Sequence, residues 1–116
     1  MKVKIDLSKD GLAMIYKPYE IVAWAVVMAI SIPVGSGYVW AKTNEALKKL
    51  DGTTISRASV IFFLNREVDK GFMGWNDATG KGGHHRLYFS RLSEGELLHR
   101  IKEKVCEKLS HAMGEY

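Results

Sequence analysis

Residues 54–72 read TISRASVIFFLNREVDKGF. Ser56 is suited to cap a helix over Arg57–Lys70, because its hydroxyl accepts a hydrogen bond from a free backbone N–H of the first turn. Gly71 closes that helix, since glycine adopts the left-handed backbone conformation without a steric penalty. Phe72–Asn76 then reads as a strand. The stretch therefore predicts a capped helix that leads directly into a strand.

A turn, a returning strand and a last helix follow. Residues 78–83 read ATGKGG, which is typical of a flexible turn, and His84–Ser90 alternates in polarity as the returning strand. Ser93 and Glu96 form a capping box, in which each side chain accepts from the backbone N–H of the other residue. This box predicts a helix within residues 93–116 that carries one apolar stripe: Leu97, Ile101, Val105 and Leu109.

Two helices are expected before residue 54. Tyr19–Ile32 is apolar on all sides, and the apolar run Ile21–Val34 is too short to span a bilayer, so it indicates a buried helix. Ser36 is the expected cap of a second helix over Tyr38–Leu50, after which Thr53–Ile55 is short and β-branched. The second helix presents one shared face: Val39, Thr43, Ala46, Leu47 and Leu50.

The remaining residues form an N-terminal extension. Met1–Leu7 alternates in polarity, and Leu12–Tyr16 either returns as the second strand of a hairpin or begins the next helix. With 116 residues, of which 47% are hydrophobic, the chain fits one compact domain. We therefore expect an extension over 1–17, a domain over 18–92 and a C-terminal helix over 93–116.

Charge and cysteine content narrow the class of protein. The net charge of +4 and a pI near 9.2 suit an acidic partner, and both nucleic acid and an anionic membrane fit. The single cysteine, Cys106, favours a reducing, cytoplasmic compartment. The sequence lacks paired carboxylates, a nucleophile elbow and a cysteine with a positioned histidine, so we expect no enzyme and no cofactor.

The order of the expected elements resembles that of a winged helix, a helix-turn-helix variant with a β-hairpin wing. Residues 54–60, Phe63-Leu64 and residues 68–72 resemble the recognition-helix-to-wing segment of the multiple-antibiotic-resistance regulators and penicillinase repressors. Leu92–Gly95 is similar to the turn that begins their dimerisation helix. The resemblance runs from residue 19 to residue 113 and implies an α+β fold, a winged helix followed by a dimerisation helix.

The same resemblance implies a transcriptional regulator that binds double-stranded DNA, sequence-specifically and as a homodimer. Helix 56–70 would enter the major groove, and hairpin 72–90 would touch the backbone or the minor groove. Arginine and asparagine match base edges, while hydroxyls and lysine hold phosphates. The expected DNA-binding residues are Ser56, Arg57, Ser59, Asn65, Arg66, Lys81, His84, His85 and Arg86, and the expected dimerisation residues are Leu97, Ile101, Val105 and Leu109. The simpler alternative is that hairpin 72–90 binds no DNA and that its charges only keep it solvated.

Two positions depart from the pattern of those families. Glu67 stands where they bury an apolar residue, so either the helix turns toward Val68 or Glu67 pairs with a basic neighbour. Ile61 and Phe62 stand where DNA readers usually carry polar or basic residues. They fit contact with a thymine methyl, or a second function, in which a winged helix docks a protein partner through Ile61 and Phe62.

A sensor is a further alternative. His99, Glu103 and Cys106 follow one another at helical spacing, which would suit a transition metal or an oxidation-sensitive thiol. The ordinary polar flank of a helix explains the same residues, so we expect no metal site. Trp24, Trp40 and Trp75 are expected to pack in the core or at the base of the hairpin.

Overall fold

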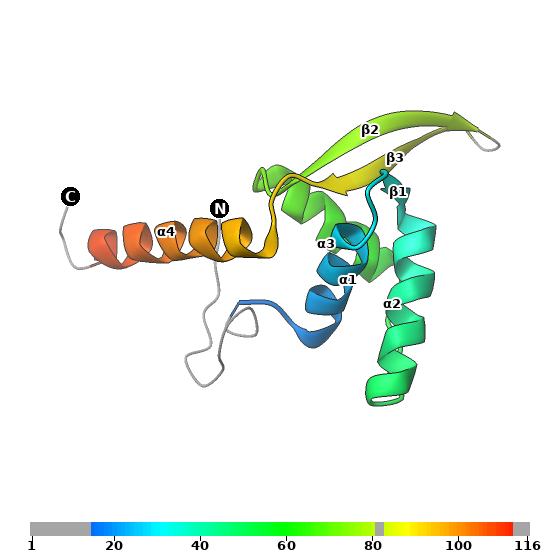
Figure 1. The fold of residues 1–116 in the computed structure, drawn as a ribbon, viewed down its shortest axis with the longest axis horizontal. Helices are drawn as coiled ribbons and strands as arrows, with labels where there is room; N and C mark the ends of the chain where they lie inside the picture. Colours follow the sequence, from blue (N-terminus) through cyan, green and yellow to red (C-terminus); the bar gives the residue numbers. More distant parts are fainter. Residues whose placement is uncertain (1–14, 81–82, 113–116) are drawn as a thin grey trace.

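The computed structural model describes residues 15–80 and 83–112 of the chain. Within them lie four helices and a three-stranded antiparallel sheet of strand order β1-β3-β2, an α+β arrangement compatible with the expected winged-helix layout (Figure 1). The elements are α1 (Pro18–Met28), β1 (Val34–Gly35), α2 (Ser36–Leu50), α3 (Arg57–Asp69), β2 (Met73–Gly80), β3 (Gly83–Ser90) and α4 (Glu94–Ala112).

Both ends of α3 form as residues 54–72 predict. The Ser56 hydroxyl oxygen accepts from the Ser59 N–H at 3.1 Å, which satisfies a free donor of the first turn. At the other end Lys70 caps the helix, and Gly71 has a φ of 81°. In this conformation the Phe72 N–H donates to the Glu67 carbonyl at 3.1 Å, so the chain turns directly into β2.

The first helix is shorter than the predicted Tyr19–Ile32. It ends at Met28, with Ala29 as its C-cap, and the predicted end at Ile32 is disfavoured because Ile32 directly precedes Pro33. The chain then extends to form β1. Since β1 ends at Gly35, this glycine occupies the N-cap of α2. Ser36, the predicted cap, is instead the first residue of α2.

The third strand comes from residues 34–35, and the β-branched residues 53–55 form no strand. The Ile55 N–H donates to the Asn44 side chain at 2.7 Å, and the Ile55 carbonyl accepts from the Trp40 indole at 2.8 Å. Because side chains of α2 satisfy this backbone, the segment has no need of a sheet partner. Residues 34–35 pair with β3 instead.

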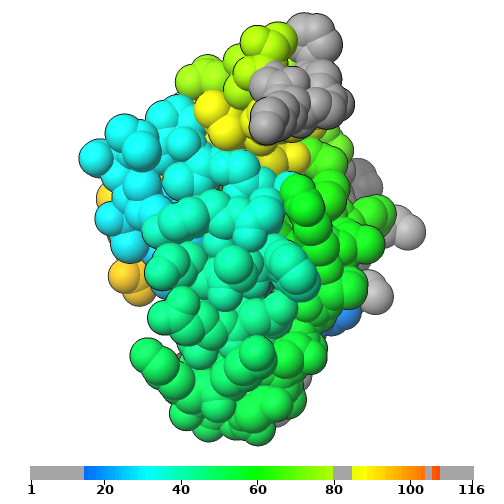
Figure 2. Space-filling view, turned by 90° about the vertical axis from the view of Figure 1, so that its right-hand side faces the viewer, coloured from blue at the N-terminus to red at the C-terminus, as the bar shows by residue number. Residues whose placement is uncertain are grey.

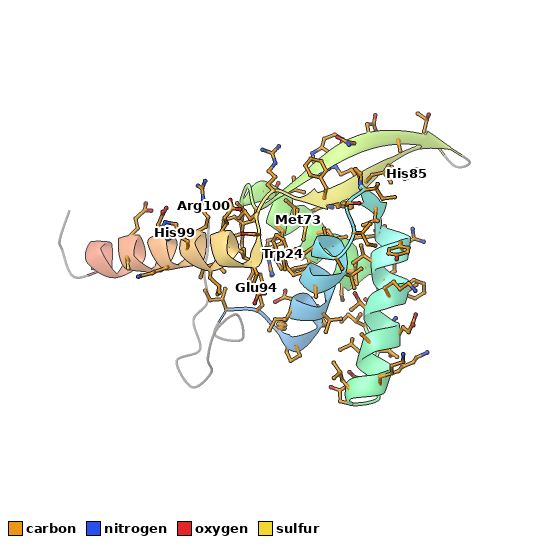
Figure 3. All side chains as sticks on the ribbon, viewed as in Figure 1. Trp24, Met73, His85, Glu94, His99 and Arg100 are labelled. Carbon is orange, nitrogen blue, oxygen red and sulfur yellow. The ribbon has the colours of Figure 1, made fainter. Side chains whose placement is uncertain are left out.

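The core fills the space between α1, α2, α3 and the sheet. Figure 3 shows Trp24 and Met73 pointing into it. On α2 the predicted face is buried at Val39, Thr43 and Leu47, whereas Leu50 is 72% exposed because it lies at the free end of the helix, away from the sheet (Figure 1). The apolar core consists of Tyr16, Ala23, Trp24, Val27, Val34, Val39, Val60, Phe63, Leu64, Phe72, Met73, Tyr88 and Leu97.

The β2–β3 hairpin is longer than predicted, since β2 continues to Gly80. Tyr88 is its buried residue on β3, and the flanking Leu87 and Phe89 are half-buried, so both faces of this strand are partly covered. On the neighbouring strand Gly74 is required, because a Cβ there would meet the Phe89 ring at 2.4 Å. Close packing at this glycine fixes the base of the hairpin.

Helix α4 projects from the body of the molecule (Figure 1). Its capping box is confirmed: the Ser93 and Glu96 side chains accept from each other's backbone N–H at 3.2 and 3.3 Å. Leu97 is fully buried in the core of its own chain, so this predicted dimerisation residue has no surface for a second chain. Ile101 packs partly on the same core. The side chains of the other two predicted dimerisation residues, Val105 and Leu109, lie outside the described part.

The expected N-terminal hairpin lies almost entirely outside the described residues. Tyr16, at its predicted end, lies in a turn and is buried in the core, so it belongs to the domain and not to a separate extension. In the described ranges, no helix combines the length and the apolar character that crossing a bilayer requires.

Candidate nucleic-acid interface

The first turn of α3 lies exposed beside the first turn of α2. Ser56 and Ser59 join through their hydroxyls at 2.9 Å, and Arg57 is exposed next to them. The Arg57 guanidinium lies over Gly37, where a Cβ would meet its Nη2 atom at 3.4 Å. The small size of Gly37 therefore leaves room for the guanidinium beside the first turn of α2.

A hollow of about 430 Å³ separates these two helix starts from β3. Figure 2 shows the elements around it: α2 across the face, α3 along its side and the hairpin above. The first backbone N–H groups of a helix have no partners within the helix, so the start of α2 attracts anions. The hollow is lined by Gly35, Ser36, Gly37, Tyr38, Arg57, Ile61, His85, Arg86 and Tyr88.

Arg86 is held in place on the hairpin. Its guanidinium carbon lies 4.3 Å from the centre of the Trp75 ring, and its Nη1 atom donates to Asn65 Oδ1 at 3.1 Å. The Tyr88 hydroxyl donates to the same oxygen at 2.7 Å. Burial raises the pKa of Tyr88, so the phenol keeps the proton that this hydrogen bond needs. Trp75 and Tyr88 thus help to position Arg86 beside α3. This role was not predicted from the sequence for either residue.

Arg66 has a different role from Arg57 and Arg86. Its Nη2 atom donates to Glu20 Oε2 at 2.6 Å, which joins α3 to the start of α1. Burial alone would lower the pKa of Arg66, but the hydrogen bond and charge of Glu20, with the charge of Glu67, raise it. The structure therefore places Arg66 in a bridge between helices and apart from the hollow.

The buried carboxylate of Glu67 is paired, which is the second of the two arrangements expected for it. Tyr16 and the Trp24 indole donate to Oε1, the latter at 2.8 Å, while Lys70 Nζ lies 3.0 Å from Oε2. Trp24 is a core residue, as predicted, and it also satisfies this charge. The helix has no need to turn toward Val68.

The middle of α3 presents an apolar side to solvent. Phe62 is 74% exposed, Ala58 one turn earlier is exposed, and Ile61 is half-buried at the hollow. Of the expected hairpin residues, His85 is exposed above the start of α2 (Figure 3). The backbone of His84 pairs with β2, but its side chain and the whole of Lys81 lie outside the described residues.

Of the three residues considered for a sensor on α4, His99 and Glu103 are in contact. His99 Nε2 lies 2.7 Å from Glu103 Oε1 on an exposed face, and Cys106 is exposed one turn further. Over the described part of the chain, no group of three His, Cys, Asp or Glu side chains could hold a metal ion.

Comparison of the chain with protein-family models, curated proteins and solved structures finds no match. Function is therefore inferred from the geometry of the surface formed by α2, α3 and the hairpin.

Proposed function

We propose that the chain is a cytoplasmic winged-helix regulator of transcription that binds double-stranded DNA sequence-specifically. In this proposal α3 enters the major groove, and the β2–β3 hairpin acts as the wing on the backbone or in the minor groove. The protein acts by occupying its site and carries out no catalysis. The observation that carries the proposal is the placement of Arg57, Arg86 and the N-terminus of α2 around one hollow.

The charges on this surface support double-stranded DNA as the partner. Phosphate groups of DNA lie along a regular path, and a surface that binds them needs cations and backbone N–H groups at separate fixed points. Trp75 and Asn65 hold Arg86, so its guanidinium is oriented before binding, and the exposed Arg57 lies beside Gly37 at the start of α2. Residues 78–92 contribute three basic residues and two histidines without an acid, in a chain of net charge +4.

The proposed regulator is a homodimer joined through α4. This helix projects from the body, and among its described side chains Leu97 and Ile101 pack on the core. Leu98 leaves an apolar side chain 40% exposed on this projecting helix, which favours pairing with its symmetry mate. Two-fold symmetry then predicts a nearly palindromic site whose half-sites are about one helical turn apart.

The double variant Arg57→Ala/Arg86→Ala tests the proposal. We expect its affinity for duplex DNA to fall about tenfold or more for each arginine, because each supplies a fixed cation for the backbone or a base edge. Lys49→Ala, at the exposed end of α2 away from the hairpin, is the matched control and should change affinity less than about twofold. Equal losses in the two proteins would contradict the proposal.

A protein-interaction module is the second candidate, because Phe62 is 74% exposed. A large exposed aromatic side chain is typical of a docking site for a protein. If this candidate holds, the double arginine variant keeps its affinity for the protein partner, and Phe62→Ala loses that affinity.

A further inference from the structure

We infer that α3 reads thymine bases through their C5-methyl groups, with Phe62 as the reading side chain. This inference rests on the proposed DNA-binding function and adds the class of base that the site selects. Two features of α3 support it: the Asn65 side chain is already hydrogen-bonded, and the exposed side chains in the middle of the helix are apolar.

Asn65 is unavailable for reading adenine. A bidentate pair with adenine requires the side-chain oxygen of asparagine to accept from the base while its nitrogen donates. The Asn65 oxygen has two lone pairs, and it already accepts from Arg86 at 3.1 Å and from Tyr88 at 2.7 Å. Adenine reading would break both hydrogen bonds and remove one of the two contacts that hold Arg86.

The side chains that remain on this part of α3 are apolar. Phe62 projects from the middle of the helix with 74% of its surface exposed, Ala58 lies one turn earlier, and Ile61 flanks them. Asp69, exposed two turns after Phe62, opposes phosphates by its charge, so the N-terminal half of the helix is the half that enters a groove. The apolar feature that the major groove displays is the C5-methyl group of thymine.

The surroundings of Phe62 favour DNA over an apolar protein surface. Arg57 lies one to two turns before it on the same helix, and Arg86 faces α3 from the hairpin. Asn65, the partner of Arg86, lies one turn after Phe62, so a cation is held next to the turn that carries the aromatic ring. Two cations on this side of the domain complement a polyanion, and a neutral apolar partner would have to desolvate or avoid them. Charge complementarity thus assigns duplex DNA as the occupant of this face.

Deoxyuridine tests the inference, because it differs from thymidine only by the missing methyl group and keeps all hydrogen-bonding groups. A duplex selected from a random-sequence library is resynthesised with each thymine replaced by uracil, and binding is measured by fluorescence anisotropy. For the wild-type chain we expect about a fourfold loss of affinity for each methyl that Phe62 contacts.

Two variants assign the effect to Phe62. Phe62→Ala, whose side chain is exposed and outside the core, should bind the thymine and uracil duplexes with equal affinity. Leu50→Ala removes a side chain that is 72% exposed at the far end of α2 and should keep the wild-type preference for thymine.

Three other results would contradict the inference, and one of them would also contradict the proposed function. Salt-dependent binding with equal affinity for the thymine and uracil duplexes overturns the inference and leaves the proposed function standing. A thymine preference that persists in Phe62→Ala overturns it too, because another side chain then reads the methyl groups. No binding to any duplex overturns the proposed function together with the inference, and leaves Phe62 as an anchor for a protein partner.

Discussion

The indole Nε1 atom of Trp24 donates a hydrogen bond to Glu67 Oε1 at 2.8 Å, in the interior of the molecule. Lys70 completes the pair with an ammonium group 3.0 Å from the second oxygen, and the ring of Tyr16 lies 5.1 Å from that ammonium group. Residues before α1, in α1 and at the end of α3 thus meet at one carboxylate. This cluster fixes the position of α3 relative to the rest of the domain.

Replacement of Glu67 tests the cluster. Glu67→Ala leaves Lys70 buried without its partner and removes the acceptor of Trp24, so we expect the free energy of unfolding to fall by about 3–5 kcal/mol. Glu67→Gln keeps an acceptor oxygen and should lose less. Urea denaturation measures both. Asp69→Ala, exposed on the same helix, is the control, with an expected change of no more than about 0.5 kcal/mol.

The stability of the fold at alkaline pH depends on Tyr16. Burial raises the pKa of its hydroxyl far above the ordinary value of 10.0, and the charge of Glu67 raises it further. Above pH 10 the unfolded chain therefore loses a proton that the folded chain keeps, so stability present below pH 10 declines as the pH rises.

We expect this decline to be steeper in the wild-type chain than in Tyr16→Phe by about 1.4 kcal/mol per pH unit. Urea denaturation of both proteins between pH 9 and about pH 11.5 measures the difference. Tyr19 and Tyr88, whose pKa values burial also raises, titrate in both proteins and cancel in the comparison. Parallel slopes would contradict the assignment to Tyr16.

The base of the hairpin depends on Gly74. A Cβ there would meet Phe89 ring atoms at 2.4 and 2.6 Å, so Gly74→Ala should lower the free energy of unfolding by about 1–3 kcal/mol. Gly95→Ala, in the first turn of α4 with nothing within 4 Å of the added atom, should leave it unchanged or raise it by up to about 1 kcal/mol. Thermal unfolding of the pair gives the comparison, and a stable Gly74→Ala variant would show that the strands are less tightly packed.

Dimer formation through α4 predicts a particle of twice the 13.1 kDa chain mass in analytical ultracentrifugation. Leu98 is 40% exposed at the start of this helix, so Leu98→Lys should spare the fold of the single chain. We expect its dimer dissociation constant to rise at least about tenfold, because an apolar contact is replaced by a charge on both subunits. A wild-type chain that sediments as a monomer at micromolar concentration would contradict the dimer.

Local signals in the sequence predicted both ends of α3 and the start of α4, but not the end of α1 or the cap of α2. Ser56, Gly71 and the Ser93–Glu96 box act within a few residues of their own position, so their roles follow from residue type and spacing. The strand β1 escaped prediction because it is two residues long and its partner lies more than fifty residues away. The strand expected at residues 53–55 was wrong for a related reason, because the side chain of Asn44 takes the place of a strand partner for Ile55.

The candidate site was predictable in composition but not in arrangement. Arg57 and Arg86 were expected together and both line the hollow. Arg66 was expected with them, but a partner 46 residues away, Glu20, holds it elsewhere. Trp75 supports Arg86 only because of the register of two strands, which alternation of polarity alone does not specify.

The most direct test of the DNA-binding proposal is fluorescence anisotropy of a labelled random-sequence duplex, titrated with the protein at several salt concentrations. Neutralised phosphates release counterions, and each adds about 0.9 to the slope of the log–log plot of affinity against salt. The proposal predicts micromolar binding with a steep slope, reduced in the Arg57→Ala/Arg86→Ala variant. No binding at low salt would contradict the proposal and favour the second candidate, a protein-interaction module.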